Sequence, residues 1–364
     1  MYGQKTGKEN DNNDKIAIEV GEIKFPPQDV LQLKSYYLSS SVHVDSIDYL
    51  IGYNYRLHSL DCMNLKSKSV TQIVLPGDGP DAIVRLSGIY AQSLDSVWIS
   101  DESERAFLID SVGTIKRMID LKKYLEDQEQ LLINTNYAMF TSHLFYNASR
   151  HSLMFLVKHT PSNTFIVKEA FIDEVGKMAT YQLSSSKVVP DMSKGYAYIN
   201  FPNVNFVGEN IVYNYPVESS IYMLDIRTNE RKYILADSHY TSNIIEKCTT
   251  SGDYATLEKH WLENSHFYDI MYLPKYKIYA RLHADKVDFD EKKGMEKLIN
   301  ERDLYLMLFD ENMEKIGETK LSNCRYSPFT SWNATYGGIA LFVDNVLDEK
   351  NNTDDLTIDI ISLK

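Results

Sequence analysis

A strand-rich unit recurs along this chain and constrains what the chain can fold into. Each unit has an apolar strand, a loop, a second strand that ends in Asp, a tight turn and a third strand. The Asp residues that mark the units are Asp61, Asp110, Asp173, Asp225 and Asp310. They lie 49, 63, 52 and 85 residues apart, which suits propeller blades of about 40 to 50 residues with insertions. The sequence therefore predicts an all-β fold, a six-bladed β-propeller of four-stranded antiparallel blades; a β-sandwich or two stacked barrels is the alternative.

The last unit of the chain is one strand short. It has strands at Ile339–Val343 and Leu356–Leu363, after which the sequence ends. A ring must close, and an unpaired edge strand is a liability. Lys15–Val20 alternates apolar and polar residues as a strand does and precedes the first unit. We expect this N-terminal strand to complete the sixth blade, so that residues 15–364 form a single domain.

Three insertions have the pattern of short helices. They are Asp120–Leu132, Asp253–Leu262 and Asp290–Ile299, each starting with an Asp suited to capping and carrying apolar residues at helical spacing.

The long connections of the predicted ring all fall on one face. In each blade the strands run A, B, C, D from the channel outward, so D-to-A and B-to-C connections share a face, which we call the long-loop face. The opposite face carries the short A-to-B and C-to-D turns. The long connections are residues 122–142, 184–203, 236–266, 283–302 and 344–355. Long loops on a rigid scaffold commonly carry function, so we expect a binding site on the long-loop face, at the mouth of the central channel.

Composition excludes some classes of partner. The formal net charge is -13 and the isoelectric point is about 5.2, which repels a phosphate backbone and argues against nucleic acid. No run reaches the roughly 20 apolar residues of a membrane-spanning helix. Residues 1–14 are polar and predict a disordered leader.

The sequence contains no motif of a known catalytic or metal site. It has no GxSxG nucleophile turn, no HExxH or HxH pair and no CxxC. The loop Asp348–Asp355 is rich in carboxylates but lacks EF-hand spacing, so we interpret it as a solvated loop. We expect no metal and no cofactor. Cys248 and Cys324 both lie in D-to-A connections on one face, where a disulfide would be geometrically possible.

Two short segments, together with the repeated unit, carry a family resemblance. Pro76–Pro80 follows the first blade, and the runs Ser265–Ile270 and Tyr276–Arg281 lie in a later one. With these segments the chain resembles an uncharacterised Bacteroidetes family of six-bladed, TolB-like propellers, over about residues 15–364. The resemblance implies a cell-envelope protein, often a lipoprotein of the periplasm or outer membrane, with no established activity. The sequence as given has neither a signal region nor a lipid-accepting Cys near Met1.

Candidate ligand-binding residues are those placed near the inner strands that could bind a carboxylate or a sugar. An arginine there can grip a carboxylate through its planar fork or tie blades together through carbonyl groups. Aromatic and amide side chains near the mouth could form a pocket for carbohydrate. The candidates are Arg85, Arg281, His143, Tyr146, Asn147, Trp332 and Asn333.

Two functions fit these features. The first is a non-enzymatic binding propeller that presents its long-loop face to a carbohydrate, a peptide or an envelope protein. The second is a propeller enzyme acting on a sugar or lactone, with a metal or paired carboxylates assembled from separate blades. Convergence of two or more carboxylates or histidines at the channel mouth would favour the enzyme.

Overall fold

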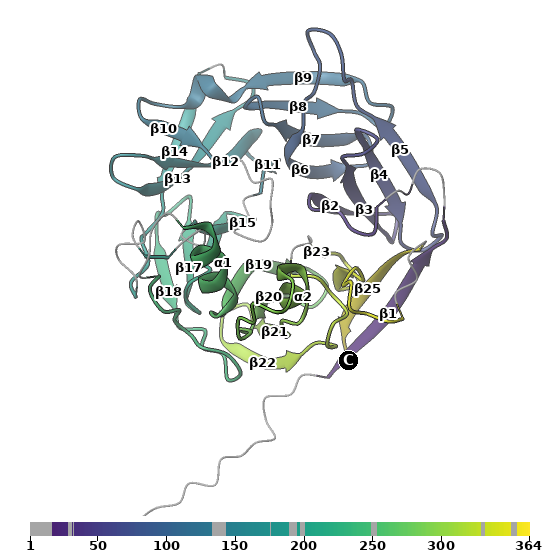
Figure 1. Cartoon of the computed structure of the whole chain (residues 1–364). Helices are drawn as coiled ribbons and strands as arrows, with labels where there is room; N and C mark the ends of the chain where they lie inside the picture. The colour runs from purple at the N-terminus through teal and green to yellow at the C-terminus, as the bar shows by residue number, and fades with distance from the viewer. Residues whose placement is uncertain are drawn as a thin grey trace, which may run out of the picture.

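The computed structural model describes residues 17–27, 31, 33–132, 143–174, 176–188, 195–196, 201–248, 253–328, 332–350 and 355–364. Within these residues the chain forms six small antiparallel sheets that follow one another around a ring (Figure 1). In most of the sheets the strands lie side by side in the order in which the chain makes them. The predicted six-bladed β-propeller is therefore confirmed.

The first two blades each use four consecutive strands. Blade 1 consists of β2 (Ser39–Val44), β3 (Ile47–Asn54), β4 (Ser59–Asn64) and β5 (Val70–Val74). Blade 2 consists of β6 (Leu86–Ser93), β7 (Ser96–Asp101), β8 (Arg105–Ile109) and β9 (Ile115–Asp120).

Blade 3 differs because two short strands share its inner position. Its members are β10 (Glu129–Leu131), β11 (Phe145–Asn147), β12 (Ser152–His159), β13 (Thr164–Phe171) and β14 (Met178–Gln182). The strands β10 and β11 pair with opposite ends of β12.

Blades 4 and 5 return to four strands each. Blade 4 consists of β15 (Asn203–Val207), β16 (Asn210–Asn214), β17 (Ile221–Asp225) and β18 (Arg231–Ile234). Blade 5 consists of β19 (His266–Leu273), β20 (Ile278–Ala284), β21 (Leu304–Phe309) and β22 (Lys315–Lys320).

Blade 6 joins the two ends of the described chain. It consists of β23 (Trp332–Ala334), β24 (Ile339–Phe342), β25 (Leu356–Leu363) and β1 (Ile18–Phe25). The strand β1 pairs with β25 over its whole length, from Ile18 opposite Leu363 to Phe25 opposite Leu356. The predicted closure by an N-terminal strand is confirmed, but the strand continues five residues beyond Val20. Lys15 and Ile16, with the leader of residues 1–14, lie outside the described residues.

The marker Asp residues mostly cap the turns between the third and fourth strands. Asp110 accepts hydrogen bonds from the backbone N–H groups of Val112 and Thr114. Asp225 and Asp310 do the same in their own turns. These bonds replace backbone pairing where the chain reverses. Each side chain therefore stabilises the turn of its blade.

Two of the markers do not follow this pattern. Asp61 lies inside β4, fully buried, where it accepts hydrogen bonds from Tyr36 and Asn54. Its turn is capped instead by Asn64, whose side-chain oxygen accepts from the N–H groups of Lys66 and Ser67. Asp173 follows β13 and forms an exposed ion pair with Arg117.

The three predicted helices are only partly correct. Helix α1 (Tyr254–Leu262) follows Asp253 as predicted, and α2 (Met295–Asn300) begins five residues later than predicted, after Gly294. The predicted helix Asp120–Leu132 is wrong: a single 3-10 turn, η1 (Leu121–Tyr124), is followed by β10. Pairing of β10 with β12 outweighs the helical pattern there, since tertiary contacts override propensity.

The hydrophobic core is divided among the seams between neighbouring blades. Each of six apolar clusters joins residues of two adjacent blades, such as Ile51 of β3 with Ile89 and Phe107 of blade 2. The apolar core therefore follows the seams around the ring. In the described part of the chain, no helix is long and apolar enough to cross a membrane.

Candidate functional site

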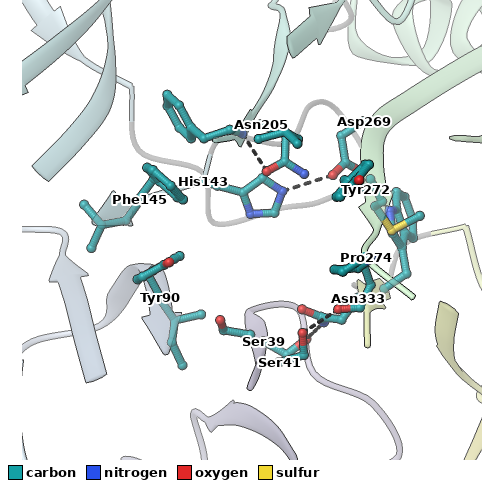
Figure 2. Close-up of a pocket in the computed structure, with 18 of the residues that line it drawn as sticks. Ser39, Ser41, Tyr90, His143, Phe145, Asn205, Asp269, Tyr272, Pro274 and Asn333 are labelled. Carbon is teal, nitrogen blue, oxygen red and sulfur yellow. Dashed lines mark hydrogen bonds and ion pairs between the residues drawn. The ribbon is translucent and has the colours of Figure 1, made fainter. Parts of the chain in front are cut away.

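The inner strands of the blades surround a cavity of about 360 Å³ on the axis of the ring (Figure 2). Its lining draws on β2, β6, β15, β19 and β23, and on the stretch from His143 to Phe145 at the start of β11. It extends from Trp332, where β23 begins, to Gly208 and Pro274 in the short turns after β15 and β19. This volume is at the lower end of the range of about 300 to 1,000 Å³ that is typical of small-molecule sites.

Asp269 is the charged centre of the cavity wall. It is almost completely buried, and one carboxylate oxygen accepts a hydrogen bond of 2.8 Å from the indole N–H of Trp332. The other carboxylate oxygen lies 3.0 Å from Nε2 of His143. An ionised carboxylate only accepts, so this contact places a proton on Nε2. The three side chains come from blades 5, 6 and 3.

A β-bulge in β19 places Asp269 in this position. Phe267 pairs with His283 and Ile270 with Arg281, so two residues of β19 stand opposite one residue of β20. Such an extra residue turns a side chain out of the regular alternation of a strand.

Side-chain amides and hydroxyls join neighbouring inner strands around the cavity. Asn205 Nδ2 donates to the carbonyl of Ile270, and Ser41 Oγ donates to the carbonyl of Ala334. Asn333 Nδ2 donates to Ser39 Oγ at 2.6 Å. The inner strand of each blade has one edge without a partner strand, and these bonds satisfy some of the backbone polar groups on that edge. They also fix the orientation of the polar side chains of the wall.

Aromatic rings form another part of the wall. The rings of Tyr90 and Phe145 meet edge to face with centroids 5.0 Å apart, and Phe145 stacks on Phe206 at 4.9 Å. Trp332 packs edge to face on Tyr268 at 4.6 Å. Burial raises the pKa of the Tyr90 hydroxyl. The cavity therefore combines flat apolar surfaces with a few oriented polar groups, as ligand pockets do.

Three of the seven candidate residues lie in this cavity. His143, Trp332 and Asn333 come from different parts of the chain and line the same space. His143 and Trp332 share Asp269 as their acceptor. The remaining four candidates lie elsewhere.

Arg281 is a structural clamp between blades 4 and 5. It is fully buried in β20 and donates to the carbonyls of Ser219 and Ala236 in blade 4. Its guanidinium lies between the rings of Phe267 and Phe309. Arg281 therefore joins two blades through carbonyl groups, which is the second of the two roles considered for it in the sequence, the first being ligand binding.

Arg85, Tyr146 and Asn147 also lie outside the cavity. Arg85 is exposed and contacts Tyr37 and Glu102 at the edge of the seam between blades 1 and 2. Tyr146 stacks on Trp98 in the seam between blades 2 and 3. Asn147 caps the following turn by accepting from Ser149.

Sequence reasoning missed Asp269, Asn205, Tyr90 and Phe145. Asp269 carried a usable signal, because a carboxylate inside an otherwise apolar strand is seldom buried without a partner. The other three carried none, since the sequence does not show which side of an inner strand faces the channel.

Other predicted features can be placed as well. Within the described residues, no group of three or more His, Cys, Asp and Glu side chains could hold a metal ion. In the loop from Asp348, the described part contacts Arg325 and the N–H of Lys350, and residues 351–354 lie outside it. All three cysteines are described, and no disulfide joins them.

The fold and its central cavity define a six-bladed propeller with a space of small-molecule size on its axis. The family model of DUF4221, a domain of unknown function, matches residues 9–320, and the chain belongs to this family. No curated protein matches the chain.

Two solved structures share the fold over nearly the whole chain. A crystal structure of a DUF4221 member from Bacteroides vulgatus has a TM-score of 0.77 at 14% identity and covers 97% of this chain and 99% of its own. A Bacteroides fragilis protein named for its expected export has a TM-score of 0.52 at 11% identity and covers 95% of each chain.

Proposed function

We propose that the protein is a non-enzymatic binding propeller whose ligand is a small hydroxyl-bearing molecule held in the central cavity. The observation that carries the proposal is the cavity itself, about 360 Å³ in volume and lined by inner strands that come from different blades. A site built on strands holds its side chains more firmly than one built on loops. The ligand would contact several blades at once.

The wall supports a ligand of the size of a monosaccharide. Tyr90 and Phe145 offer ring faces and edges against which the apolar side of a sugar ring can pack. Asn333, Asn205 and Asp269 offer amide and carboxylate groups for hydroxyls. A peptide or protein partner would need a far larger surface than this cavity provides.

The alternative, an enzyme acting on a sugar or lactone, has less support. Glycoside hydrolysis generally uses two carboxyl groups on either side of the scissile bond. Asp269 is the single carboxylate among the described residues that line the cavity, and each of its oxygens already accepts a hydrogen bond. His143 and Asp269 do converge, which is the arrangement expected of an enzyme, but the described residues of the cavity lining supply no second carboxyl group to act with them.

The position of the site on the long-loop face stays a prediction. His143 lies just before β11 and Trp332 begins β23, whereas Gly208 and Pro274 follow β15 and β19 at the opposite end of the cavity. Access from either end is compatible with the proposal. The envelope location implied by the family resemblance also stays a prediction.

Filling the cavity tests the proposal. Ligand-observed NMR against a panel of monosaccharides, amino sugars and sugar acids would first identify molecules that bind. Each would then be titrated into Ser41→Trp, which places an indole in the cavity, and into Ser67→Trp, which places the same group on an exposed turn. We expect Ser41→Trp to abolish binding and Ser67→Trp to preserve it. Equal binding by both variants would refute a site in the channel.

A further inference from the structure

We propose that the ligand of the central cavity carries a protonated amine, so that its class is a small hydroxylated ammonium cation such as an amino sugar. This inference rests on the proposed binding function and specifies the chemistry of the same site. It follows from the charge of the wall, from the use of its hydrogen-bond donors, and from its aromatic surface.

The charge of the wall favours a cation. Asp269 is almost completely buried, and no Lys or Arg occurs among the described residues that line the cavity. The other titratable groups of the lining are His143, which donates to Asp269, and the phenols of Tyr90 and Tyr272. An anionic ligand would lie close to a carboxylate with no Lys or Arg side chain beside it. The formal charge of -13 over the whole chain adds attraction for a cation.

Several hydrogen-bond donors of the wall are used within the protein. The Nε2 proton of His143 and the indole N–H of Trp332 both point to Asp269. The hydroxyl of Ser41 donates to the backbone carbonyl of Ala334, and Asn205 donates one amide N–H to the backbone carbonyl of Ile270. Each side-chain amide keeps a second N–H, but the hydroxyl of Ser41 and the indole have no other proton.

Two acceptor side chains of the wall keep unused lone pairs. An ionised carboxylate has about four lone-pair sites, and the hydrogen bonds from His143 and Trp332 occupy two of those of Asp269. The hydroxyl oxygen of Ser41 likewise keeps its lone pairs while its proton is used. A ligand group that donates hydrogen bonds complements these acceptors. An ammonium group has three donors and no acceptor.

Aromatic rings of the cavity wall point to the same class of ligand. Trp332 donates to Asp269, and Tyr90, Phe145 and Phe206 continue the wall around the cavity. An organic cation gains attraction from ring faces within about 6 Å. A metal ion would need several oxygen or nitrogen ligands in place of rings, and the described residues contain no such group.

Three sugars of the same size and different charge test the inference. Glucosamine below the pKa of its amine is a cation, glucose is neutral and glucuronate is an anion. The full chain would be labelled with fluorotryptophan, which gives one fluorine resonance for each of its three tryptophans. A Trp332→Phe variant assigns the resonance that reports on the cavity wall.

The inference predicts a ranking by charge. Glucosamine should shift the Trp332 resonance saturably, with a dissociation constant at least about tenfold below that of glucose, because a hydrogen bond to a charged group is worth about that factor or more. Glucuronate should bind weakest. In Asp269→Asn, which keeps the side-chain shape, the affinity for glucosamine should fall to within about twofold of that for glucose. Asp225→Asn removes one carboxylate from an outer turn and should leave the ranking unchanged.

The possible failures are distinguishable. If glucose or glucuronate saturates the Trp332 resonance at the same or a lower concentration than glucosamine, the cation inference is wrong while binding in the channel stands. If Asp269→Asn retains the full preference for glucosamine, the assignment of Asp269 is wrong. If none of the three sugars shifts the resonance, the proposed site fails for this class of ligand, and the inference fails with it.

Discussion

Replacing Arg281 by methionine should weaken the contact between blades 4 and 5. Arg281 donates to the carbonyls of Ser219 and Ala236 at 2.5 and 2.9 Å, and its guanidinium centre lies 4.8 Å from the ring centroid of Phe267. Removing Arg281 leaves two buried carbonyls without this hydrogen-bond donor, which costs about 1 to 3 kcal/mol of stability for each carbonyl. Methionine fills part of the volume but cannot donate.

The net loss is smaller than that sum. Burial of the Arg281 guanidinium lowers its pKa to about 9, so the native structure holds this charge at a cost that the substitution removes. We therefore expect the free energy of unfolding to fall by about 2 to 4 kcal/mol. Urea denaturation, monitored by tryptophan fluorescence, measures this change in the free energy of unfolding. The slope of that free energy against urea concentration, the m value, should be the same in the variant and the parent.

Arg85→Met is the matched control. Arg85 is exposed, and its contacts with Tyr37 and Glu102 are long, at 3.4 and 3.7 Å. We expect its substitution to change the free energy of unfolding by less than about 0.5 kcal/mol. An Arg281→Met protein that is as stable as Arg85→Met would refute the interpretation of Arg281 as a clamp.

Three further predictions test the turns, a buried ionic network and the closure of the ring. Gly113→Ala should lower the stability measured in thermal unfolding by more than Gly176→Ala does. Both glycines have positive φ, 86° and 81°, so an alanine at either position costs about 1 to 2 kcal/mol of backbone strain. Only at Gly113 would the added Cβ also lie 2.5 Å from the carbonyl oxygen of Val74. Equal losses would contradict this. Burial of the Glu318 carboxyl acts to raise its pKa, but hydrogen bonds from His283, Ser238 and the N–H of His239 outweigh it and lower the pKa from 4.5 to about 2. The stability that this carboxylate contributes is present above pH 4.5 and is lost as the pH falls to about 2. Between these pH values, the free energy of unfolding of Glu318→Gln should therefore fall by less than that of the parent protein. An identical pH dependence of stability in the two proteins would refute the network. Removal of residues 1–25 should abolish soluble expression because β25 loses its partner strand, whereas removal of residues 1–14 should leave the melting temperature unchanged.

The fold could be predicted because its signals are local. A strand, an Asp and a turn recur within a few residues, and the side chains of Asp110, Asp225 and Asp310 form the turn bonds that the pattern indicates. In the first blade the same geometry is supplied by Asn64, since an amide oxygen accepts from the turn N–H groups as a carboxylate oxygen does. The marker at Asp61 was therefore wrong in position.

The helix predicted at Asp120–Leu132 shows what local pattern misses. Asp120 does cap a turn, with its side chain accepting from the N–H of Lys122. Beyond that turn, Glu126 and Glu129 both lie 3.0 Å from the fully buried Lys168 Nζ of β13. This long-range pairing draws Glu129–Leu131 into strand β10.

The site could be predicted only in part because it is formed by long-range contacts. The candidates His143, Trp332 and Asn333 line the cavity because they lie at or near the start of inner strands, a position that the strand pattern indicates. The apolar strand around Asp269 signals that its carboxylate is buried with a partner, but the bulge that turns this side chain to the cavity leaves no sequence signature. Arg85 lies just before an inner strand, but its guanidinium contacts Tyr37 and Glu102 instead of the channel.

A crystal structure of the protein with a ligand from the sugar panel tests the central claim most directly. The account predicts electron density inside the ring, with the ligand amine next to Asp269 and its ring against Tyr90 and Phe145 (Figure 2). Density in the groove between α1 and α2, which is lined by Lys259 and Met295, with an empty channel, would contradict it.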